Sequence, residues 1–200
     1  DYYRGIFSLY EFNDSMPVEI KKRREDKNHG GDPVSVSDNR EKLVEILAFC
    51  LMPNHLHLLL RQITDSGITK FMNKFGAGYP AYFRRKHAET GSPSAVNKGY
   101  FFQGRFVSVH IENDTQLKTV FAYIHTNPIS LVEIGWKERK VNDFQKAAEF
   151  IKNYKWSSYG DYLGIKNFPS LTERDLMLKI MGGQKECKSF IENWINFKGK

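Results

Sequence analysis

Residues 43–62, LVEILAFCLMPNHLHLLLRQ, form the stretch that decides the predicted fold of this chain. Two short runs rich in Leu, Ile, Val and Phe flank the dipeptide Pro53-Asn54, which is a strong turn signal. Short apolar runs on both sides of a turn are typical of two strands joined as a hairpin. We therefore expect residues 43–62 to form a β-hairpin.

The second strand of this hairpin is predicted to have two different faces, because side chains alternate along a strand. Leu56, Leu58 and Leu60 share one face, which we expect to belong to the core. The opposite face carries four side chains: His55, His57, Leu59 and Arg61. Two neighbouring imidazoles can hold one divalent metal ion between them. They can equally form a half-buried, hydrogen-bonded pair, and the spacing alone leaves both interpretations open.

The length and composition indicate a soluble globular protein. A chain of 200 residues suits one domain and is long enough to bury a proper core. The 30 Lys and Arg residues exceed the 23 Asp and Glu residues, which favours a polyanionic partner. A basic balance can also reflect nothing more than a solvated surface.

The cysteines and the hydropathy pattern bear on the location of the protein. Cys50 lies inside an apolar run and Cys187 in a polar segment, so the sequence predicts neither a disulfide framework nor a zinc knuckle. Two isolated cysteines fit a reducing cytoplasm. No apolar run reaches membrane-spanning length, and the first residues lack the pattern of a signal peptide. We therefore expect a cytoplasmic protein without a membrane partner.

Residues 68–87 have apolar side chains at helical spacing and predict a helix, which Gly76, Gly78 and Pro80 should weaken or bend. Five basic side chains lie among its aromatic ones: Lys70, Lys74, Arg84, Arg85 and Lys86. This mixture suits a single-stranded nucleic acid, with charges for phosphates and rings for bases. Alternatively, the rings are core and the charges only solvated. We expect the second interpretation for most rings, and both stay open for the last three basic residues.

Shorter patterns predict one more helix, one more strand and two loops. Residues 1–12 have helical spacing, and residues 107–111 alternate like a strand with one buried face. His110 lies on the opposite face of that strand, where it could approach the metal side or be an ordinary exposed or hydrogen-bonded histidine. The polar, Gly-rich segments 21–39 and 90–99 are expected to be loops.

The segment DTQLKTVFAYIHTNP predicts a helix with Asp114 as its N-cap and Pro128 at its end. At about 100° per residue, Tyr123 and Asn127 fall one turn apart on the same flank of this helix, beside its apolar stripe. His125 points well away from both. The flank therefore presents a phenol and an amide together at the edge of the packed face.

The last part of the chain is predicted to be mostly helical. An amphipathic helix is expected over residues 144–151, and a turn-rich aromatic segment, KWSSYGDYLG, follows it. Thr172 has the character of the N-cap of a further helix, and the apolar residues between 190 and 195 indicate a last short helix.

Four motifs occur in order along the chain: MPNHLHLLL at 52–60, YFFQGRF at 100–106, YIHTNP at 123–128 and WSSY at 156–159. In this order they resemble the motifs of REP-associated tyrosine transposases, which belong to the single-tyrosine HUH transposases of bacteria. The likeness covers roughly residues 43–163, and four ordered motifs are far more specific than two histidines alone.

The resemblance implies a ferredoxin-like fold of the α+β class, with an antiparallel sheet, helices packed on one face and the HUH histidines on the open face. The family has a strand before its first helix, and this sequence starts at the helix, so we expect that strand to be missing from it. The implied transposase domain comprises residues 1–163. Residues 164–200 are expected to be a C-terminal helical extension packed on it.

The resemblance also implies a metal-dependent enzyme that nicks and rejoins single-stranded DNA at hairpin-forming palindromes. Tyr123 matches the family's nucleophile, which forms a phosphotyrosine with the 5′ end of the cut strand and leaves a free 3′-OH. His55 and His57 match its metal-binding histidines, and Asn127 would complete a site for Mg²⁺ or Mn²⁺. DNA contacts are expected from six basic residues: Lys70, Lys74, Arg84, Arg85, Lys86 and Arg105.

Two other functions stay open on the sequence alone. The chain could be a domesticated relative that binds DNA hairpins without cutting them. It could also be a metal-dependent hydrolase that uses water, in which case Tyr123 would only pack. The family likeness further implies a bacterial, nucleoid-associated protein, and the sequence does not decide between a monomer and a homodimer.

Overall fold

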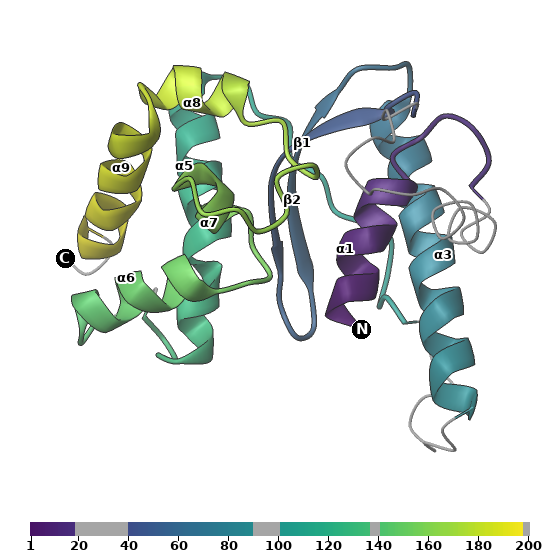
Figure 1. The fold of residues 1–200 in the computed structure, drawn as a ribbon, viewed down its shortest axis with the longest axis horizontal. Helices are drawn as coiled ribbons and strands as arrows, with labels where there is room; N and C mark the ends of the chain where they lie inside the picture. The colour runs from purple at the N-terminus through teal and green to yellow at the C-terminus, as the bar shows by residue number, and fades with distance from the viewer. Residues whose placement is uncertain (19–39, 90–100, 137–140, 198–200) are drawn as a thin grey trace. The chain divides into compact units, whose positions relative to one another are not determined.

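The computed structural model of this α+β protein describes residues 1–18, 40–89, 101–136 and 141–197 (Figure 1). The contacts within the chain divide it into two compact units. Unit 1 comprises Asp1–Val44 and Gln62–Ser108, and unit 2 comprises Glu45–Arg61 and Val109–Lys200. The loops expected at residues 21–39 and 90–99 lie outside the described residues.

Unit 1 is built on two packed helices, α1 (Tyr2–Glu11) and α3 (Gly67–Glu89), which lie side by side in Figure 1. The expected helix over residues 1–12 is thereby confirmed. Just beyond α1, Asn13 joins this helix to the start of the hairpin. Its Nδ2 donates to the Val44 carbonyl at 2.8 Å, and its Oδ1 accepts the backbone N–H groups of Leu43 and Val44 at 3.0 Å each. One buried amide side chain thus satisfies three backbone groups.

Helix α3 runs without interruption through the residues expected to weaken it, and Pro80 lies inside it. Gly78 has a packing role there. A Cβ atom built on Gly78 would lie only 2.2 Å from Cζ of Phe12, so the absence of a side chain lets the aromatic ring approach the helix backbone. Gly76, half a turn earlier, has nothing within 4 Å of the corresponding position.

We predict that Gly78→Ala destabilises unit 1 by about 1–3 kcal/mol, because the added methyl group overpacks against the buried Phe12 ring. Gly76→Ala is the matched control. It should stabilise the same helix by up to about 1 kcal/mol, because alanine has the better helix propensity and meets no obstacle. Unfolding midpoints in urea measure both effects. Equal midpoints for the two variants would contradict this account of α3.

The predicted hairpin is present as β1 (Val44–Leu51) and β2 (Leu56–Gln62), which form a two-stranded antiparallel sheet. The turn at Pro53-Asn54 is closed by a backbone hydrogen bond from Met52 N to His55 O at 2.8 Å. Strand β1 is buried along almost its whole length, as expected for a continuous apolar run with partners on both faces.

The expected division of β2 into a core face and an open face is wrong at Leu59. Leu59, on the same face as His57, is only 3% exposed and packs into the core of unit 2 with Phe121 and Ala122. The other three leucines of the strand, Leu56, Leu58 and Leu60, are only partly buried. Strand alternation separates the two faces correctly, but which face is covered depends on the helix that packs there.

Residues 107–111 do not form the strand that their alternating pattern predicts. Val107 is 93% exposed and Val109 is 75% exposed, and neither belongs to a strand. An apolar alternation becomes a strand only where a neighbouring strand offers backbone groups for pairing. Among the described residues, the sheet consists of β1 and β2 alone. The larger ferredoxin-like sheet therefore stays a prediction.

Unit 2 adds α5 (Asp114–Thr126), a 3₁₀-helix η1 (Asn127–Leu131), α6 (Phe144–Asn153), α7 (Tyr159–Tyr162), α8 (Asp175–Met181) and α9 (Gln184–Phe197). The N-cap of α5 is Asn113 and not Asp114, because Asn113 has the extended backbone and accepts Gln116 N–H through its side chain at 2.9 Å. The α-helix ends before Pro128, as expected, and the chain continues as η1.

The predicted cap at Thr172 is also wrong. Helix α8 begins at Asp175, and Thr172 instead accepts a hydrogen bond from the Arg174 guanidinium at 3.0 Å. The next residue, Glu173, donates its backbone N–H to the Ile46 carbonyl of β1 at 3.0 Å. This pairing with the strand holds the chain out of the helix until Arg174. The helices expected over residues 144–151 and 190–195 are both present, and the second is longer than predicted.

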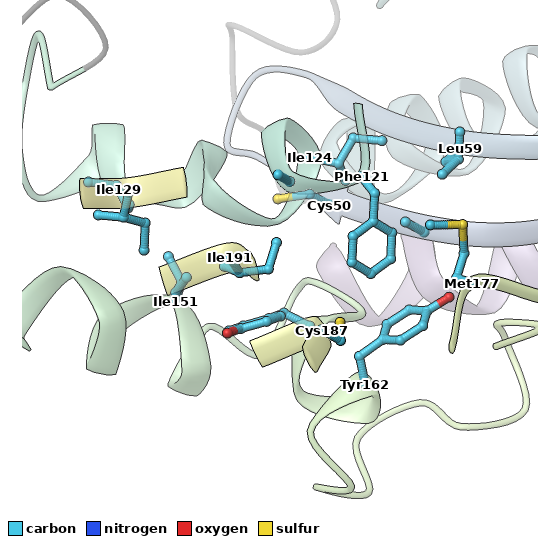
Figure 2. Packing of buried hydrophobic residues seen from close by; sticks show 14 of the residues in the cluster. Cys50, Leu59, Phe121, Ile124, Ile129, Ile151, Tyr162, Met177, Cys187 and Ile191 are labelled. Carbon is cyan, nitrogen blue, oxygen red and sulfur yellow. The ribbon is translucent and has the colours of Figure 1, made fainter. Parts of the chain in front are cut away.

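The core of unit 2 lies between the hairpin and the helices α5 to α9 (Figure 2). Phe121, Tyr162 and Ile191 are among its fully buried side chains. Cys50 and Cys187 are both free and buried, and burial raises the pKa of each thiol to about 12, so neither is a reactive thiolate. Within the described segments, no helix combines the length and apolar character needed to cross a membrane.

Candidate active site

Three of the residues singled out by the sequence meet within unit 2. The rings of His55 and His57 lie edge to face, with centroids 4.7 Å apart and an interplanar angle of 84°. The ring of Tyr123 meets the ring of His57 in the same way, at 5.3 Å and 80°. Tyr123 is 39% exposed, so part of this residue is accessible to solvent while its ring contacts His57.

The local sequence explains why these rings meet. His57 precedes Leu59 on the same face of β2, and Tyr123 follows Phe121 and Ala122 on α5. Leu59, Phe121 and Ala122 all belong to one buried cluster, so β2 and α5 contribute to the same core. The rings of His57 and Tyr123 lie next to this apolar cluster. The apolar stripe of the helix therefore determines where the tyrosine lies relative to the histidine.

Asn127 lies one helical turn beyond Tyr123, as predicted. Its backbone N–H donates to the Tyr123 carbonyl, and its own carbonyl accepts the Ser130 hydroxyl at 2.7 Å. However, Asn127 is only 2% exposed, whereas it was expected at the edge of the packed face. Asn127 is therefore part of the packed interior, at the point where α5 passes into η1.

The side chains of His55, His57 and Asn127 are each chemically suitable as ligands of a divalent cation. Two imidazole nitrogens and an amide oxygen are all neutral ligands, and they would leave the full charge of the ion available for a phosphate. His55 is also oriented, because its Nδ1 lies 2.7 Å from the Oδ1 of Asn54. An outer hydrogen bond of this type fixes the ring so that the other nitrogen can ligate. Within the described segments, no group of three or more His, Cys, Asp or Glu side chains is arranged so that it could hold a metal ion.

Other tyrosines of unit 2 are poorly placed to act as nucleophiles. Tyr159 and Tyr162 are buried, and burial raises the pKa of both phenols far above the usual range. The Tyr162 hydroxyl donates to the Leu47 carbonyl at 2.6 Å. The Tyr154 hydroxyl donates to the Leu51 carbonyl at 2.7 Å. Both hydroxyl groups thus fasten surrounding segments to β1.

The basic residues expected to contact DNA belong to unit 1, and they fall into two groups. Lys70, Arg84, Arg85 and Arg105 are exposed. Lys74 instead donates to the backbone carbonyls of Asp14 and Met16, the latter at 2.7 Å, and therefore fastens α3 to the residues after α1. Lys86 forms an ion pair with Asp1 at 2.7 Å. The structure thus gives Lys74 a packing role that its sequence position does not reveal.

Two residues of the site region were not assigned a role from the sequence. His125 is completely buried, and its Nε2 shares a hydrogen bond of 2.8 Å with the Ser158 hydroxyl. Burial lowers the pKa of His125 to about 3, so the imidazole is neutral at physiological pH. The signal was nonetheless present, because His125 lies within YIHTNP and Ser158 within WSSY.

His110, considered for the metal side, is exposed, and its backbone carbonyl accepts a hydrogen bond from the Gln116 side chain at 3.3 Å. Of the two alternatives for His110, the structure therefore favours an ordinary exposed histidine.

Comparison with known families gives one match. Residues 36–127 match the family described as "Transposase IS200 like". No curated protein and no solved structure matches the chain significantly. The matched segment is just under half of the chain and contains the hairpin, α3 and α5. The match suggests a transposase and, at a coarse level, a DNA-processing enzyme. Over the segment that carries His55, His57 and Tyr123, the chain is thus similar to the IS200-like transposases.

Proposed function

We propose that this protein is a metal-dependent single-stranded DNA endonuclease and strand transferase of the REP-associated tyrosine transposase type. Its substrate is DNA with hairpin-forming palindromes, and Tyr123 is the nucleophile. The observation that carries the proposal is the contact between an exposed tyrosine ring and a histidine ring whose neighbour is a second histidine. Edge-to-face packing is favourable for such rings, but a phenol and two imidazoles in a partly exposed position also bring a nucleophile next to two metal-binding groups.

In the proposed reaction, Tyr123 Oη forms a bond to the phosphorus of one phosphodiester, and the bond between phosphorus and the 3′ oxygen breaks. The phenol releases its proton, and the leaving 3′ oxygen takes up a proton. The upstream fragment of the cut strand therefore ends in a free 3′-OH, and the downstream fragment is attached to Tyr123 through its 5′ phosphate. Attack by another 3′-OH on this phosphotyrosine reverses the chemistry and joins two strands.

The residues of the chain have separate tasks in this scheme. His55, His57 and Asn127 would hold Mg²⁺ or Mn²⁺, and the bound ion would supply positive charge for the phosphate oxygens and the leaving oxygen. His57 also supports the Tyr123 ring by its edge contact. The exposed basic residues of unit 1, Lys70, Arg84, Arg85 and Arg105, bind the DNA backbone.

Covalent trapping tests the proposal against the two alternatives. The protein is incubated with labelled single-stranded hairpin DNA and Mg²⁺ or Mn²⁺, and the products are separated on a denaturing gel. The proposal predicts that labelled DNA migrates with the protein. Cleaved DNA without an adduct would indicate a water-using hydrolase. Uncut DNA that binds only under native conditions would indicate a hairpin-binding protein.

A prediction for Asn127 tests the third ligand. Asn127→Ala should raise the Mg²⁺ or Mn²⁺ concentration needed for half-maximal cleavage, by about 10-fold or more, because one oxygen ligand is lost. Excess metal should partly restore the rate. Because Asn127 is buried, the unfolding midpoint is measured in parallel. A folded variant that cleaves at the wild-type metal concentration would exclude Asn127 as a ligand.

A second prediction concerns the basic residues of α3. Binding of hairpin DNA should weaken steeply with salt, since each phosphate contact releases a counterion. Replacement of Arg84 and Arg85 by glutamine should reduce the slope of log K against log salt by about 1–2, because each exposed guanidinium contributes up to about 0.7–0.9. Lys152→Gln is a control for the loss of one positive charge. Lys152 is exposed on α6, outside the proposed DNA contacts, so this variant should keep the wild-type slope. An unchanged slope in the arginine variant would move the DNA path away from the end of α3.

A further inference from the structure

Helix α5 is anchored on the side opposite the catalytic tyrosine. Tyr123 and His125 are two residues apart, which corresponds to about 200° around a helix. Tyr123 is accordingly exposed, and His125 is completely buried. The imidazole lies among aromatic rings of the core, with centroids 4.2 Å from Phe121 and 5.6 Å from both Tyr159 and Tyr162. These contacts fix the position of the imidazole ring.

The imidazole is bound to a side chain that is itself attached to the hairpin. His125 Nε2 and Ser158 Oγ are 2.8 Å apart. Ser158 Oγ accepts the backbone N–H of Phe49 at 3.0 Å, and the backbone N–H of Ser158 donates to the Phe49 carbonyl at 3.1 Å. Ser158 is thus paired with β1 through its backbone and with α5 through its side chain.

Strand pairing extends this connection to His57. Cys50 and Ser157 form an isolated antiparallel β-bridge, so the WSSY segment pairs briefly with β1. Strand β1 pairs with β2, which carries His57. A continuous set of directional bonds therefore leads from α5, through His125, Ser158 and β1, to β2. Apolar packing alone would tolerate a small slide of α5, whereas these hydrogen bonds define one position.

We propose that His125 and Ser158 are positioning residues that hold Tyr123 at its working distance from His57. The proposal rests on the function proposed above, because it assigns the YIHTNP histidine and a WSSY serine a task in the same site. Neither residue touches the reacting atoms. A displacement of about 1 Å at a reacting group can slow a reaction by about 100-fold, so a small shift of α5 matters for catalysis.

The neighbouring serine provides a matched control. Ser157 is as completely buried as Ser158, and its hydroxyl accepts the backbone N–H of Tyr159 at 3.1 Å. Ser157→Ala and Ser158→Ala therefore remove the same group from adjacent, fully buried positions, although Ser158→Ala also removes the bonds of this hydroxyl to the Phe49 backbone. Only Ser158→Ala breaks the bond to His125. If Ser158→Ala fails to fold, the pair Ser157→Cys and Ser158→Cys gives the same comparison, because a thiol keeps the volume but is a weak hydrogen-bonding group.

The first measurement is the rate of adduct formation with saturating hairpin DNA and metal, at a temperature where all variants are folded. Ser158→Ala should be slower than wild type by about 10- to 100-fold, with hairpin affinity within a few-fold. Ser157→Ala should react within about two-fold of wild type, and because it loses only one hydrogen bond, its unfolding midpoint should fall less than that of Ser158→Ala. Ser158→Thr, which keeps the hydroxyl, should recover most of the rate. Equal rates for the two alanine variants would overturn the positioning role.

A second measurement does not require activity. The Tyr123 ring, at 5.3 Å, shifts the imidazole proton resonances of His57 by its ring current, and Tyr123→Leu defines the spectrum without that effect. Ser158→Ala should move the His57 resonances toward those of Tyr123→Leu, and Ser157→Ala should not. If Ser158→Ala shows this shift but the wild-type protein forms no DNA adduct, the positioning role is supported and the proposed function is rejected. Unchanged resonances in Ser158→Ala would reject the positioning role alone.

Discussion

Tyr123→Phe is expected to form no covalent DNA adduct at all while it binds hairpin DNA within a few-fold of wild type. The substitution removes only the hydroxyl group that would attack phosphorus. It keeps the aromatic ring, and with it the edge contact to His57 at 5.3 Å. Since the side chain is 39% exposed, the free energy of unfolding should change by no more than about 0.5 kcal/mol.

Tyr154→Phe is the matched control for this experiment. It removes the hydroxyl of another tyrosine in unit 2, one that donates to the Leu51 carbonyl. This variant should lose about 1 kcal/mol of stability but retain adduct formation. Both variants are compared on the same denaturing gel with labelled hairpin DNA. A persistent adduct in Tyr123→Phe would mean that another residue is the nucleophile.

His57→Ala is expected to lower the rate of cleavage by about 100-fold or more. Loss of a residue that only supports a metal ligand costs about 10- to 100-fold, and loss of a ligand should cost at least as much. Two causes act together. The variant would lose one of the two proposed imidazole ligands, and Tyr123 loses the ring against which it lies. The measurement is the cleavage rate as a function of Mg²⁺ or Mn²⁺ concentration. The maximal rate should stay low even with excess metal, in contrast to Asn127→Ala.

His110→Ala controls for the loss of a histidine, since His110 is exposed and lies outside the ring contacts of the site. It should cleave like the wild type. The unfolding midpoint of His57→Ala is measured as well, because His57 is partly buried. If folded His57→Ala cleaves with normal metal dependence, then His55 and His57 do not form a metal site, and the proposed chemistry would need other ligands.

The parts of the fold that were predicted correctly depend on local sequence. The hairpin is defined by a Pro-Asn turn between two apolar runs, and both strands lie close to the predicted range of residues 43–62. The helix that carries Tyr123 follows from its apolar spacing. The N-cap of this helix was assigned to Asp114 instead of Asn113, because two adjacent polar side chains can both cap a helix. The cap predicted at Thr172 is wrong because Glu173 bonds to Ile46 of β1.

The parts that could not be predicted depend on distant partners. Residues 107–111 have the pattern of a strand, but a strand also needs a neighbour, which local sequence does not supply. Leu59 is buried in a cluster that includes residues of α5, which strand alternation cannot reveal. The choice of core face is therefore a tertiary property.

The candidate site shows the same division. The motifs identified His55, His57 and Tyr123, and the structure brings their rings together. Helical periodicity also predicted that His125 points away from Tyr123. It could not name Ser158 as the partner, because the two residues are 33 positions apart and meet only through the pairing of Ser158 with β1.

Mapping the covalent bond tests the central claim most directly. Wild-type protein is incubated with Mg²⁺ or Mn²⁺ and hairpin DNA labelled on both sides of the nick. The adduct is then digested with nuclease and trypsin for mass spectrometry. Cleavage after Lys118 and Lys137 gives a peptide whose only tyrosine is Tyr123. We expect this peptide to carry the 5′ phosphate of the downstream fragment, and the upstream fragment to end in a free 3′-OH. An adduct on another peptide, or a downstream fragment with a free 5′ phosphate and no bound protein, would contradict the account.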